Sequence, residues 1–202
     1  MTGHASADTL LDRSLAGISL RAPARAVAVL AAVALTAAAA QFTMPVPFTA
    51  VPFTLTPLVV MLTGAALGSR LGFLTQALYL LAGAMGLAVF APSAILPPGA
   101  LRLTGPTGGY LLAYPIAAFV TGWLAERGWD RRYVTSCASM LAGLAVIFAG
   151  GVSWLAVAFG QSLPVALSQG FTPFILADLV KVAVAAAILP QVWRFAGRHY
   201  RT

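Results

Sequence analysis

The chain has 202 residues, of which 60% are hydrophobic and 8% are charged, and its formal net charge is +7. About a quarter of the residues in a soluble globular domain are charged, so this composition excludes that class and favours a single membrane domain. The basic residues lie between apolar stretches rather than in one patch, which argues against nucleic acid as a partner and for a lipid bilayer.

The basic residues recur at intervals along the chain. Ten of the twelve fall into four groups: Arg13, Arg21 and Arg25; Arg70; Arg127, Arg131 and Arg132; Arg194, Arg198 and Arg201. If the uncharged stretches between them are membrane helices, all four groups lie on one side, and the positive-inside rule makes that side the cytoplasm. The pattern predicts an all-α integral membrane protein with six transmembrane helices and both termini cytoplasmic.

Three regions follow from this pattern. Residues 1–23 are expected to form a frayed or amphipathic cytoplasmic arm, residues 24–194 the six-helix membrane domain, and residues 195–202 a basic cytoplasmic tail. A helix needs about 20 apolar residues to span the bilayer, although tilt and adjoining segments change that number. The six helices are predicted at residues 24–41, 57–67, 71–90, 108–125, 133–159 and 173–193.

Proline and glycine mark the breaks between these helices. Pro45, Pro47, Pro52 and Pro57 interrupt the first uncharged stretch, because proline lacks the backbone donor that a helix requires. Residues 91–107 and 160–170 are predicted as outer loops that are rich in breakers, and Pro115 is expected to kink the fourth helix.

The first apolar stretch allows a second interpretation. Arg21 and Arg25, the apolar run after them and the small residues before Gln41 also resemble a secretory signal with a cleavage site. The polar segment that precedes them is long for such a signal. Removal of this helix would leave five helices and an N-terminus on the outer side.

Asp178 and Lys181 are the ionisable residues of the last helix that lie toward its outer half. Their spacing of three places them on one helix face, where opposite charges lower each other's cost of burial. They form either a structural ion pair or a polar contact for a solute. Because an ionisable residue within a membrane segment is costly, a functional site is the default hypothesis.

A glycine-rich segment opens the fourth helix. In Thr104-Gly-Pro-Thr-Gly-Gly-Tyr110, Gly108 and Gly109 permit close backbone approach, and free N–H groups at a helix start suit an anion or a carbonyl oxygen. Arg102, just upstream, is either a carboxylate clamp or a solvated loop residue.

Aromatic residues gather near the outer helix ends. Most are expected in the interfacial belt, and several, Phe53, Tyr79 and Tyr110 among them, are predicted to wall an apolar pocket. Both histidines lie in the tails, the single cysteine Cys137 begins an apolar run, and the chain has no phosphate-binding loop. No metal site, cofactor, catalytic residue or ATPase activity is therefore expected.

The first helix carries small residues four positions apart. Ala24, Ala28 and Ala32 share one face with Thr36 and Ala40, and small residues permit close helix approach in lipid. The helix is also rich in alanine elsewhere, so the spacing alone does not establish a docking face.

Three segments resemble the signature segments of the BioY family, which are the biotin-binding substrate (S) subunits of energy-coupling-factor (ECF) transporters. They are Val51-Pro-Phe-Thr-Leu55, Gly105-Pro-Thr-Gly-Gly-Tyr110 and Pro173-Phe-Ile-Leu-Ala-Asp-Leu-Val-Lys181. The resemblance extends from the first helix to the sixth. It implies six helices, an outer biotin pocket covered by the loop between the first two helices, and docking of Ala24, Ala28 and Ala32 on a membrane coupling subunit with two ATPase subunits.

The resemblance also implies roles for single residues. Asp178 matches an acceptor for the ureido N–H groups of biotin, Lys181 a donor to the ureido carbonyl or the carboxylate, and Arg102 a carboxylate contact near the mouth. Two positions depart from the family pattern: Ala177 stands where glycine is frequent, and Phe90-Ala-Pro92 stands where some members place asparagine. One ureido contact is then absent or replaced.

Two other functions compete with a substrate-binding transport subunit. One is a proton-coupled secondary carrier for a small anionic solute, in which Asp178 titrates during transport. The other is an intramembrane enzyme, which is disfavoured because Asp178 is the only acid outside the predicted cytoplasmic regions. Dependence of uptake on partner ATPases separates the first two hypotheses.

Overall fold

Long uncharged segments of this chain form helices, because only intrahelical hydrogen bonds satisfy the backbone in lipid. The structure is a computed structural model that describes residues 9–14, 21–93 and 95–199. Its elements are α1 (Leu10–Ser14), α2 (Arg21–Gln41), β1 (Thr43–Met44), β2 (Phe53–Thr54), α3 (Thr56–Leu67), α4 (Ser69–Ala84), α5 (Leu101–Thr104), α6 (Gly108–Ala125), the 3₁₀ turn η1 (Trp129–Arg131), α7 (Tyr133–Ala158), α8 (Leu163–Gly170) and α9 (Ile175–His199).

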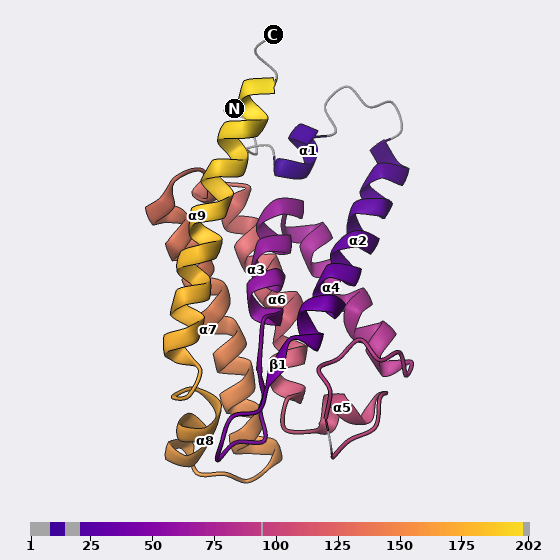
Figure 1. Ribbon diagram of the computed structural model, residues 1–202, viewed down its shortest axis with the longest axis vertical. Coiled ribbons are helices and arrows are strands. Elements are labelled where there is room, and N and C mark those ends of the chain that lie inside the picture. The colour runs from indigo at the N-terminus through magenta and orange to yellow at the C-terminus, as the bar shows by residue number, and fades with distance from the viewer. Residues whose placement is uncertain (1–8, 15–20, 94, 200–202) are drawn as a thin grey trace, which may run out of the picture.

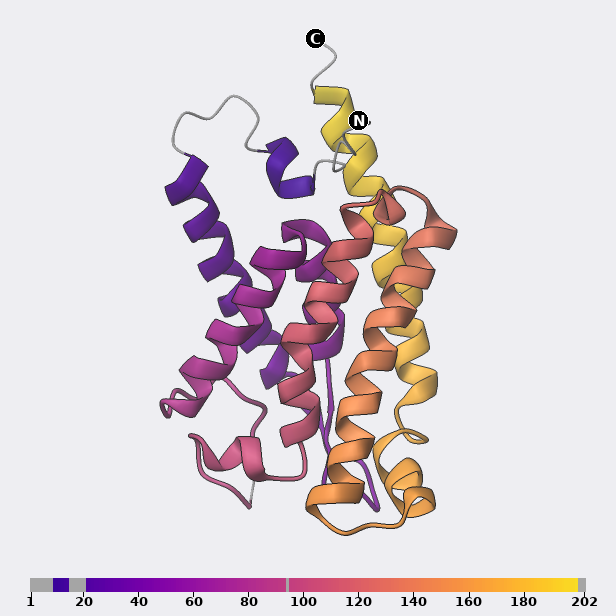
Figure 2. The ribbon, with the colours of Figure 1, turned by 180° about the vertical axis from the view of Figure 1, so that it is seen from behind.

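Among the described residues, six helices run lengthwise through the molecule, namely α2, α3, α4, α6, α7 and α9, with α6 at the centre. It packs against α3, α4 and α7, while α7 and α9 lie together on one side and α2 and α4 on the other (Figure 1; Figure 2 shows the same arrangement from behind). In its most apolar window 72% of α6 is buried, against 22% for α2. The central helix is thus shielded on most sides, and α2 is the most exposed of the long apolar helices.

The helices fit a multi-pass membrane protein. α2, α6, α7 and α9 are long and apolar enough to cross a membrane, and α3 is a shorter apolar helix. The 12 residues of α3 rise only about 18 Å, less than the hydrocarbon thickness, so α3 reaches across only together with the extended chain before it. Crossing by all six helices stays a prediction.

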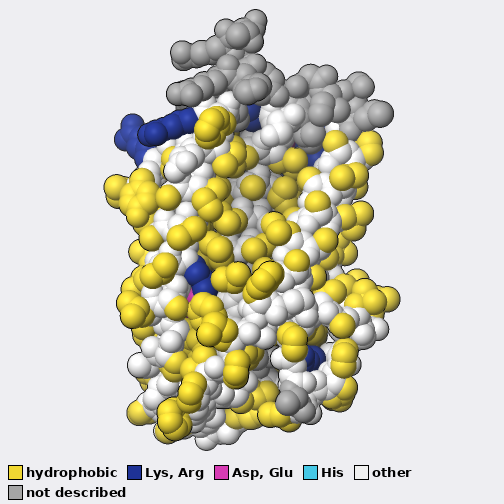
Figure 3. Space-filling model, viewed as in Figure 1, with side chains coloured by type: hydrophobic (Ala, Val, Ile, Leu, Met, Phe, Trp, Pro, Cys, Tyr) yellow, Lys and Arg dark blue, Asp and Glu magenta, His cyan; other side chains and the backbone are white. Residues whose placement is uncertain are grey.

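The two ends of the molecule differ in chemistry. At one end, here called the basic end, lie α1, the α3–α4 turn, η1 and the C-terminal part of α9; at the other, the hairpin end, lie β1, β2, α5 and α8 (Figure 1). Figure 3 shows hydrophobic side chains over the length of the face and most of the visible dark blue at the basic end. This distribution matches the predicted one-sided grouping of arginines.

Side-chain hydrogen bonds close the basic end. Glu126 accepts from the backbone N–H of Ser69 at 2.7 Å and from its hydroxyl at 2.8 Å, so it caps the start of α4. Trp193 donates from Nε1 to Asp130 Oδ2 at 2.5 Å, which ties α9 to η1. These hydrogen bonds join segments that lie far apart in the sequence: the start of α4 to the end of α6, and α9 to η1.

The structure corrects several predicted boundaries. The predicted third helix, α4, ends at Ala84 rather than at residue 90. Two residues after this end, Gly86 takes a left-handed φ of 98°. The predicted outer loop at 160–170 contains α8, whose Pro164 stands in the first turn, where proline is tolerated. α9 runs on to His199 through the predicted start of the tail.

The described part of the N-terminal arm is ordered as α1. Leu10 is buried, and Asp12 pairs with Arg25 at 2.8 Å. The rest of the arm, residues 1–8 and 15–20, and the last residues of the tail, 200–202, lie outside the described residues.

Candidate functional site: a cavity beneath the hairpin

Residues 43–54, here called the hairpin, cover a cavity of about 600 Å³. The prolines of this segment exclude helix, and its ends pair as two short antiparallel strands, Thr43 with Thr54 and Met44 with Phe53. The cavity lies between the hairpin, the loop that carries α5, and the facing parts of α6, α7 and α9. Its volume falls in the range of small-molecule sites.

Asp178 and Lys181 meet at this cavity. Lys181 donates from Nζ to Asp178 Oδ1 at 2.6 Å. Asp178 is 5% exposed and Lys181 is 7% exposed, and both line the cavity. Lys181 also donates to the main-chain carbonyl of Thr54 at 2.5 Å and lies 3.7 Å from the centroid of the Phe53 ring. The pair is therefore both an ion pair, as one interpretation of the sequence held, and part of the cavity wall.

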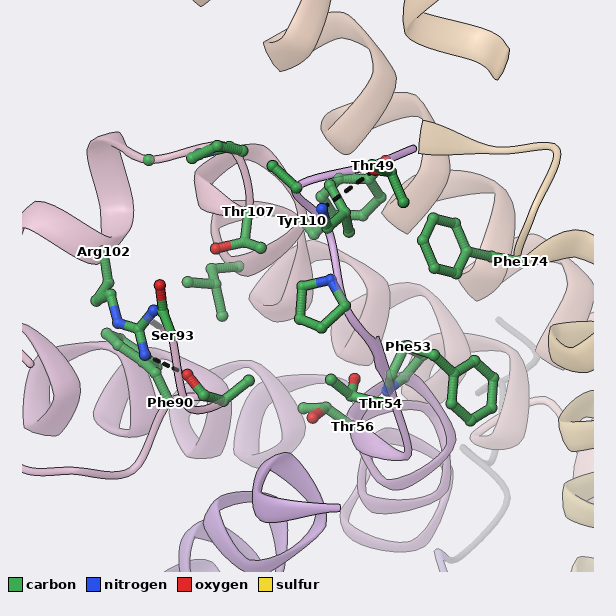
Figure 4. Close-up of a pocket in the computed structure, with 18 of the residues that line it drawn as sticks. Thr49, Phe53, Thr54, Thr56, Phe90, Ser93, Arg102, Thr107, Tyr110 and Phe174 are labelled. Atoms are coloured by element: carbon green, nitrogen blue, oxygen red, sulfur yellow. Dashed lines mark hydrogen bonds between the residues drawn. The ribbon is translucent and has the colours of Figure 1, made fainter. Parts of the chain in front are cut away.

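Arg102 approaches the cavity from the loop side. It projects from α5, is 8% exposed and donates from a terminal nitrogen to the Ala91 carbonyl, while its Nε has no partner among the described residues. Burial lowers the pKa of the guanidinium, which the nearby Tyr79 partly offsets. In Figure 4, Arg102 stands on the opposite side of the lining from Phe53 and Thr54. It is a buried cation at the cavity wall rather than a solvated loop residue.

Aromatic side chains make much of the remaining wall. Tyr79 and Phe90 contact each other edge to face with ring centroids 5.4 Å apart, and Tyr79 donates to the Val89 carbonyl at 3.2 Å. Tyr110 lines the cavity and donates to the Gly170 carbonyl at 2.6 Å, which joins α6 to the end of α8. The structure thus brings Phe53, Tyr79 and Tyr110 to the cavity.

Gly108 and Gly109 are not among the residues that line the cavity. A Cβ on Gly109 would meet the Trp154 side chain and the Gly150 carbonyl, so this glycine allows α6 and α7 to pack closely. Trp154 in turn donates from Nε1 to the Gly105 carbonyl at 2.9 Å. The structure gives the glycine pair a packing contact, and the cavity reaches the preceding Gly105 and Thr107 instead.

The small-residue face of α2 is turned toward the chain's own helices. Ala32 is buried, while Ala24 and Ala28 are half-buried. Further along the same face, Thr36 accepts from Gln76 Nε2 of α4 at 3.3 Å. A partner that used this face would meet only its half-buried end.

Sequence reasoning missed several residues of the cavity. Tyr114, Thr54, Thr56 and Phe174 line it (the last three are labelled in Figure 4). Tyr114 stands four residues after Tyr110, a spacing that puts both on one helix face, so the sequence held a signal for it. Thr54, Thr56 and Phe174 reach the cavity only through the turns of the hairpin and of the segment before α9.

The lining combines apolar walls with a few converging polar groups: an acid–base pair and a separate arginine. Among the described residues, no group of three or more His, Cys, Asp or Glu side chains is placed to hold a metal ion. Such a cavity suits a small organic solute that has hydrogen-bonding donors, an apolar body and an anionic group. A helical membrane protein with a cavity of this kind belongs to the class of solute-binding membrane proteins.

Comparison with known proteins narrows this class to a family. The profile of the BioY family matches residues 12–198. The biotin transporter BioY of Thermotoga maritima is 44% identical over 71% of this chain and 81% of its own length. The probable biotin transporter BioY of Pyrococcus horikoshii is 42% identical over 79% of this chain and 90% of its own length. The chain belongs to the BioY family, a family of transporters rather than enzymes.

A solved structure shares the fold. The crystal structure of the S-component for biotin from an ECF-type ABC transporter superposes with a TM-score of 0.73 and 21% sequence identity, over 84% of this chain and 90% of that chain. With the apolar helices described above, family and fold establish a multi-pass membrane protein.

Proposed function

We propose that this chain is the substrate-binding membrane subunit of a biotin uptake transporter, which captures biotin at the outer face. The observation that carries the proposal is the buried Asp178–Lys181 pair at the wall of a mostly apolar cavity. The names of the relatives and of the structural neighbour support it. Binding requires no metal and no cofactor in this proposal.

The polar groups of the cavity match those of biotin. Asp178 accepts a hydrogen bond from the ureido N–H groups, and Lys181 donates to the ureido carbonyl. Arg102 holds the carboxylate, because its Nε is a buried donor that meets no partner in the part of the chain that the structure describes, whereas Lys181 already donates to Asp178 and Thr54. Phe53, Tyr79 and Tyr110 enclose the thiolane ring and the aliphatic chain.

The proposed orientation places the hairpin end outside and the basic end in the cytoplasm, with all six long helices crossing a prokaryotic cell (inner) membrane. The grouping of arginines supports it through the positive-inside rule. In this orientation the cavity opens outward, where a scavenged vitamin arrives.

We propose further that the chain works with a membrane coupling subunit and two ATPase subunits, to which it passes the bound solute. The S-component character of the structural neighbour favours this arrangement over a proton-coupled carrier that uses Asp178. Of the predicted docking residues Ala24, Ala28 and Ala32, the half-buried Ala24 and Ala28 remain the proposed docking region, because Ala32 is buried within the chain.

The test is binding by the purified protein. Isothermal titration calorimetry in detergent is expected to show saturable biotin binding, and an otherwise matched biotin amide, which lacks the anionic group, should bind more weakly. Uptake by cells that express the chain with and without the partner ATPases separates the two transport mechanisms. Uptake that persists without ATPases and collapses with the proton gradient would overturn the subunit assignment.

A further inference from the structure

Lys181 joins α9 to the hairpin through a contact that spans 127 residues of sequence. Its ammonium donates to the Thr54 carbonyl, and the same nitrogen lies over the Phe53 ring. Phe53 and Thr54 are the two residues of β2. The Lys181 side chain therefore contacts both residues of β2.

Exposure along the hairpin is concentrated at its tip. The tip residue Phe48 is 98% exposed and takes a left-handed φ of 69°, which is strained for an aromatic residue. Val51, between the tip and β2, is nevertheless only 7% exposed and lines the cavity, so the hairpin lies closed over it.

We propose that Lys181 is a positioning residue that latches the hairpin closed, so that solute enters and leaves the cavity when the Lys181–Thr54 hydrogen bond breaks. A hydrogen bond from a charged donor is roughly twice as strong as a neutral one, and a buried carbonyl that loses its donor is costly. An ammonium has three donors, of which two are committed to Thr54 and Asp178. The third donor of the Lys181 ammonium is left for the solute, so the same side chain contacts both the hairpin and the solute.

The inference rests on the proposed function only in taking the cavity as the solute site, because the latch itself does not depend on the identity of the solute. A direct readout of closure is the reactivity of a cysteine at the buried position 51. We would introduce Val51→Cys in a Cys137→Ser background and measure its rate of labelling with a membrane-impermeant maleimide, without solute. Lys181→Met keeps an unbranched side chain that is one atom shorter but removes the ammonium, and should raise this rate on the order of tenfold or more.

Three variants make the test specific. Lys181→Arg keeps a charged donor and should restore slow labelling. Phe53→Leu removes the ring beneath the ammonium but leaves α9 unchanged, and should raise the rate in the same direction by a smaller factor. Arg102→Met removes the other buried cation of the cavity, which donates to Ala91 and not to the hairpin, and should leave the labelling rate unchanged.

Solute kinetics supply a second readout. With biotin, Lys181→Met should speed both association and dissociation, whereas Arg102→Met should speed dissociation alone. Labelling of Val51→Cys that is equally slow with Lys181→Met, or equally fast in every background, would overturn the latch. If biotin fails to bind but the labelling pattern holds, the proposed ligand is wrong and the latch stands.

Discussion

At the scale of single residues, the buried charges of this chain have distinct partners. Asp178 pairs with a lysine one turn along the same helix, Arg102 donates to a backbone carbonyl, and Asp130 accepts from an indole. Each is removed from water, so the cost of changing it depends on what its partner loses. Two predictions follow from this difference.

Asp178→Asn keeps the shape of the side chain but turns one acceptor oxygen into a donor that faces the ureido N–H groups. We expect biotin affinity to fall by about 2 kcal/mol or more, because a buried donor is left unpaired. Calorimetry measures the loss. Asp12→Asn, at the basic end, serves as the control and should bind as the unchanged chain does; unchanged affinity in Asp178→Asn would remove this residue from the site.

Asp130 predicts a dependence of stability on pH. Burial raises the pKa of its carboxyl group, although the hydrogen bond from Trp193 opposes the shift, and within the described ranges Oδ1 has no partner. Because the folded pKa exceeds the unfolded value of about 3.9, this group stabilises the fold most at low pH. That contribution is lost as pH rises from about 4 through the folded-state pKa.

The measurement is the thermal unfolding midpoint in detergent at several pH values between about 4 and 8, a range that begins near the reference pKa of a carboxyl group. Asp130→Asn should flatten the profile relative to the unchanged chain. Asp12→Asn, whose carboxylate is half exposed, is the matched control. Equal slopes in all three proteins would show that Asp130 does not titrate differently on folding.

At the scale of elements, α2 is the least buried of the long apolar helices, and its two faces make different contacts. One face carries Ala32 and Thr36 and packs on α3 and α4. The opposite side exposes Val27 and Leu30. Any partner that docks along α2 therefore meets either the half-buried edge at Ala28 or the exposed side.

Replacing Ala28 by leucine should weaken assembly with the coupling subunit, because close helix approach in lipid depends on small side chains. The cavity lies at the other end of the molecule, so biotin binding by the isolated chain should survive. Co-purification of the complex and calorimetry are measured side by side. Ala34→Leu, on the exposed side of α2, is the control; if it disrupts assembly and Ala28→Leu does not, docking uses the exposed side.

At the scale of the whole molecule, the proposed direction of solute capture rests on the separation of the two ends. The basic end holds α1 and the C-terminal part of α9, and the hairpin end holds β1 and β2 (Figure 1). The cavity lies beneath the hairpin. Under the positive-inside rule, the arginines of the basic end favour a cytoplasmic position for that end.

This orientation is testable with a matched pair of Ser→Cys variants in a Cys137→Ser background. Ser93 lies in the loop at the hairpin end, Ser14 closes α1 at the basic end, and both are exposed. An impermeant maleimide applied to intact cells should label Ser93→Cys and not Ser14→Cys. The reverse result would place the cavity on the cytoplasmic side. Ser136 is a poor labelling site because it is buried.

The sequence by itself determined the features that depend on neighbours along the chain. Uncharged runs placed the long helices, with the bounds of α6 matching the prediction and those of α7 differing by one residue, and the spacing of three brought Asp178 and Lys181 together. Hydrophobicity, charge and helical period are local properties, so a single pass along the chain shows them. The BioY family membership rested on short motifs of the same kind, and the comparisons confirmed it.

The tertiary structure decided which side chains meet across the chain. Only it shows that Lys181 donates to Thr54, that Gly109 packs against Trp154, and that Leu163–Gly170 form the helix α8. The small-residue face of α2 likewise proved to pack largely on the chain's own helices. These outcomes depend on contacts between residues that are distant in sequence, and such contacts are set by how the helices pack around α6 rather than by any local pattern.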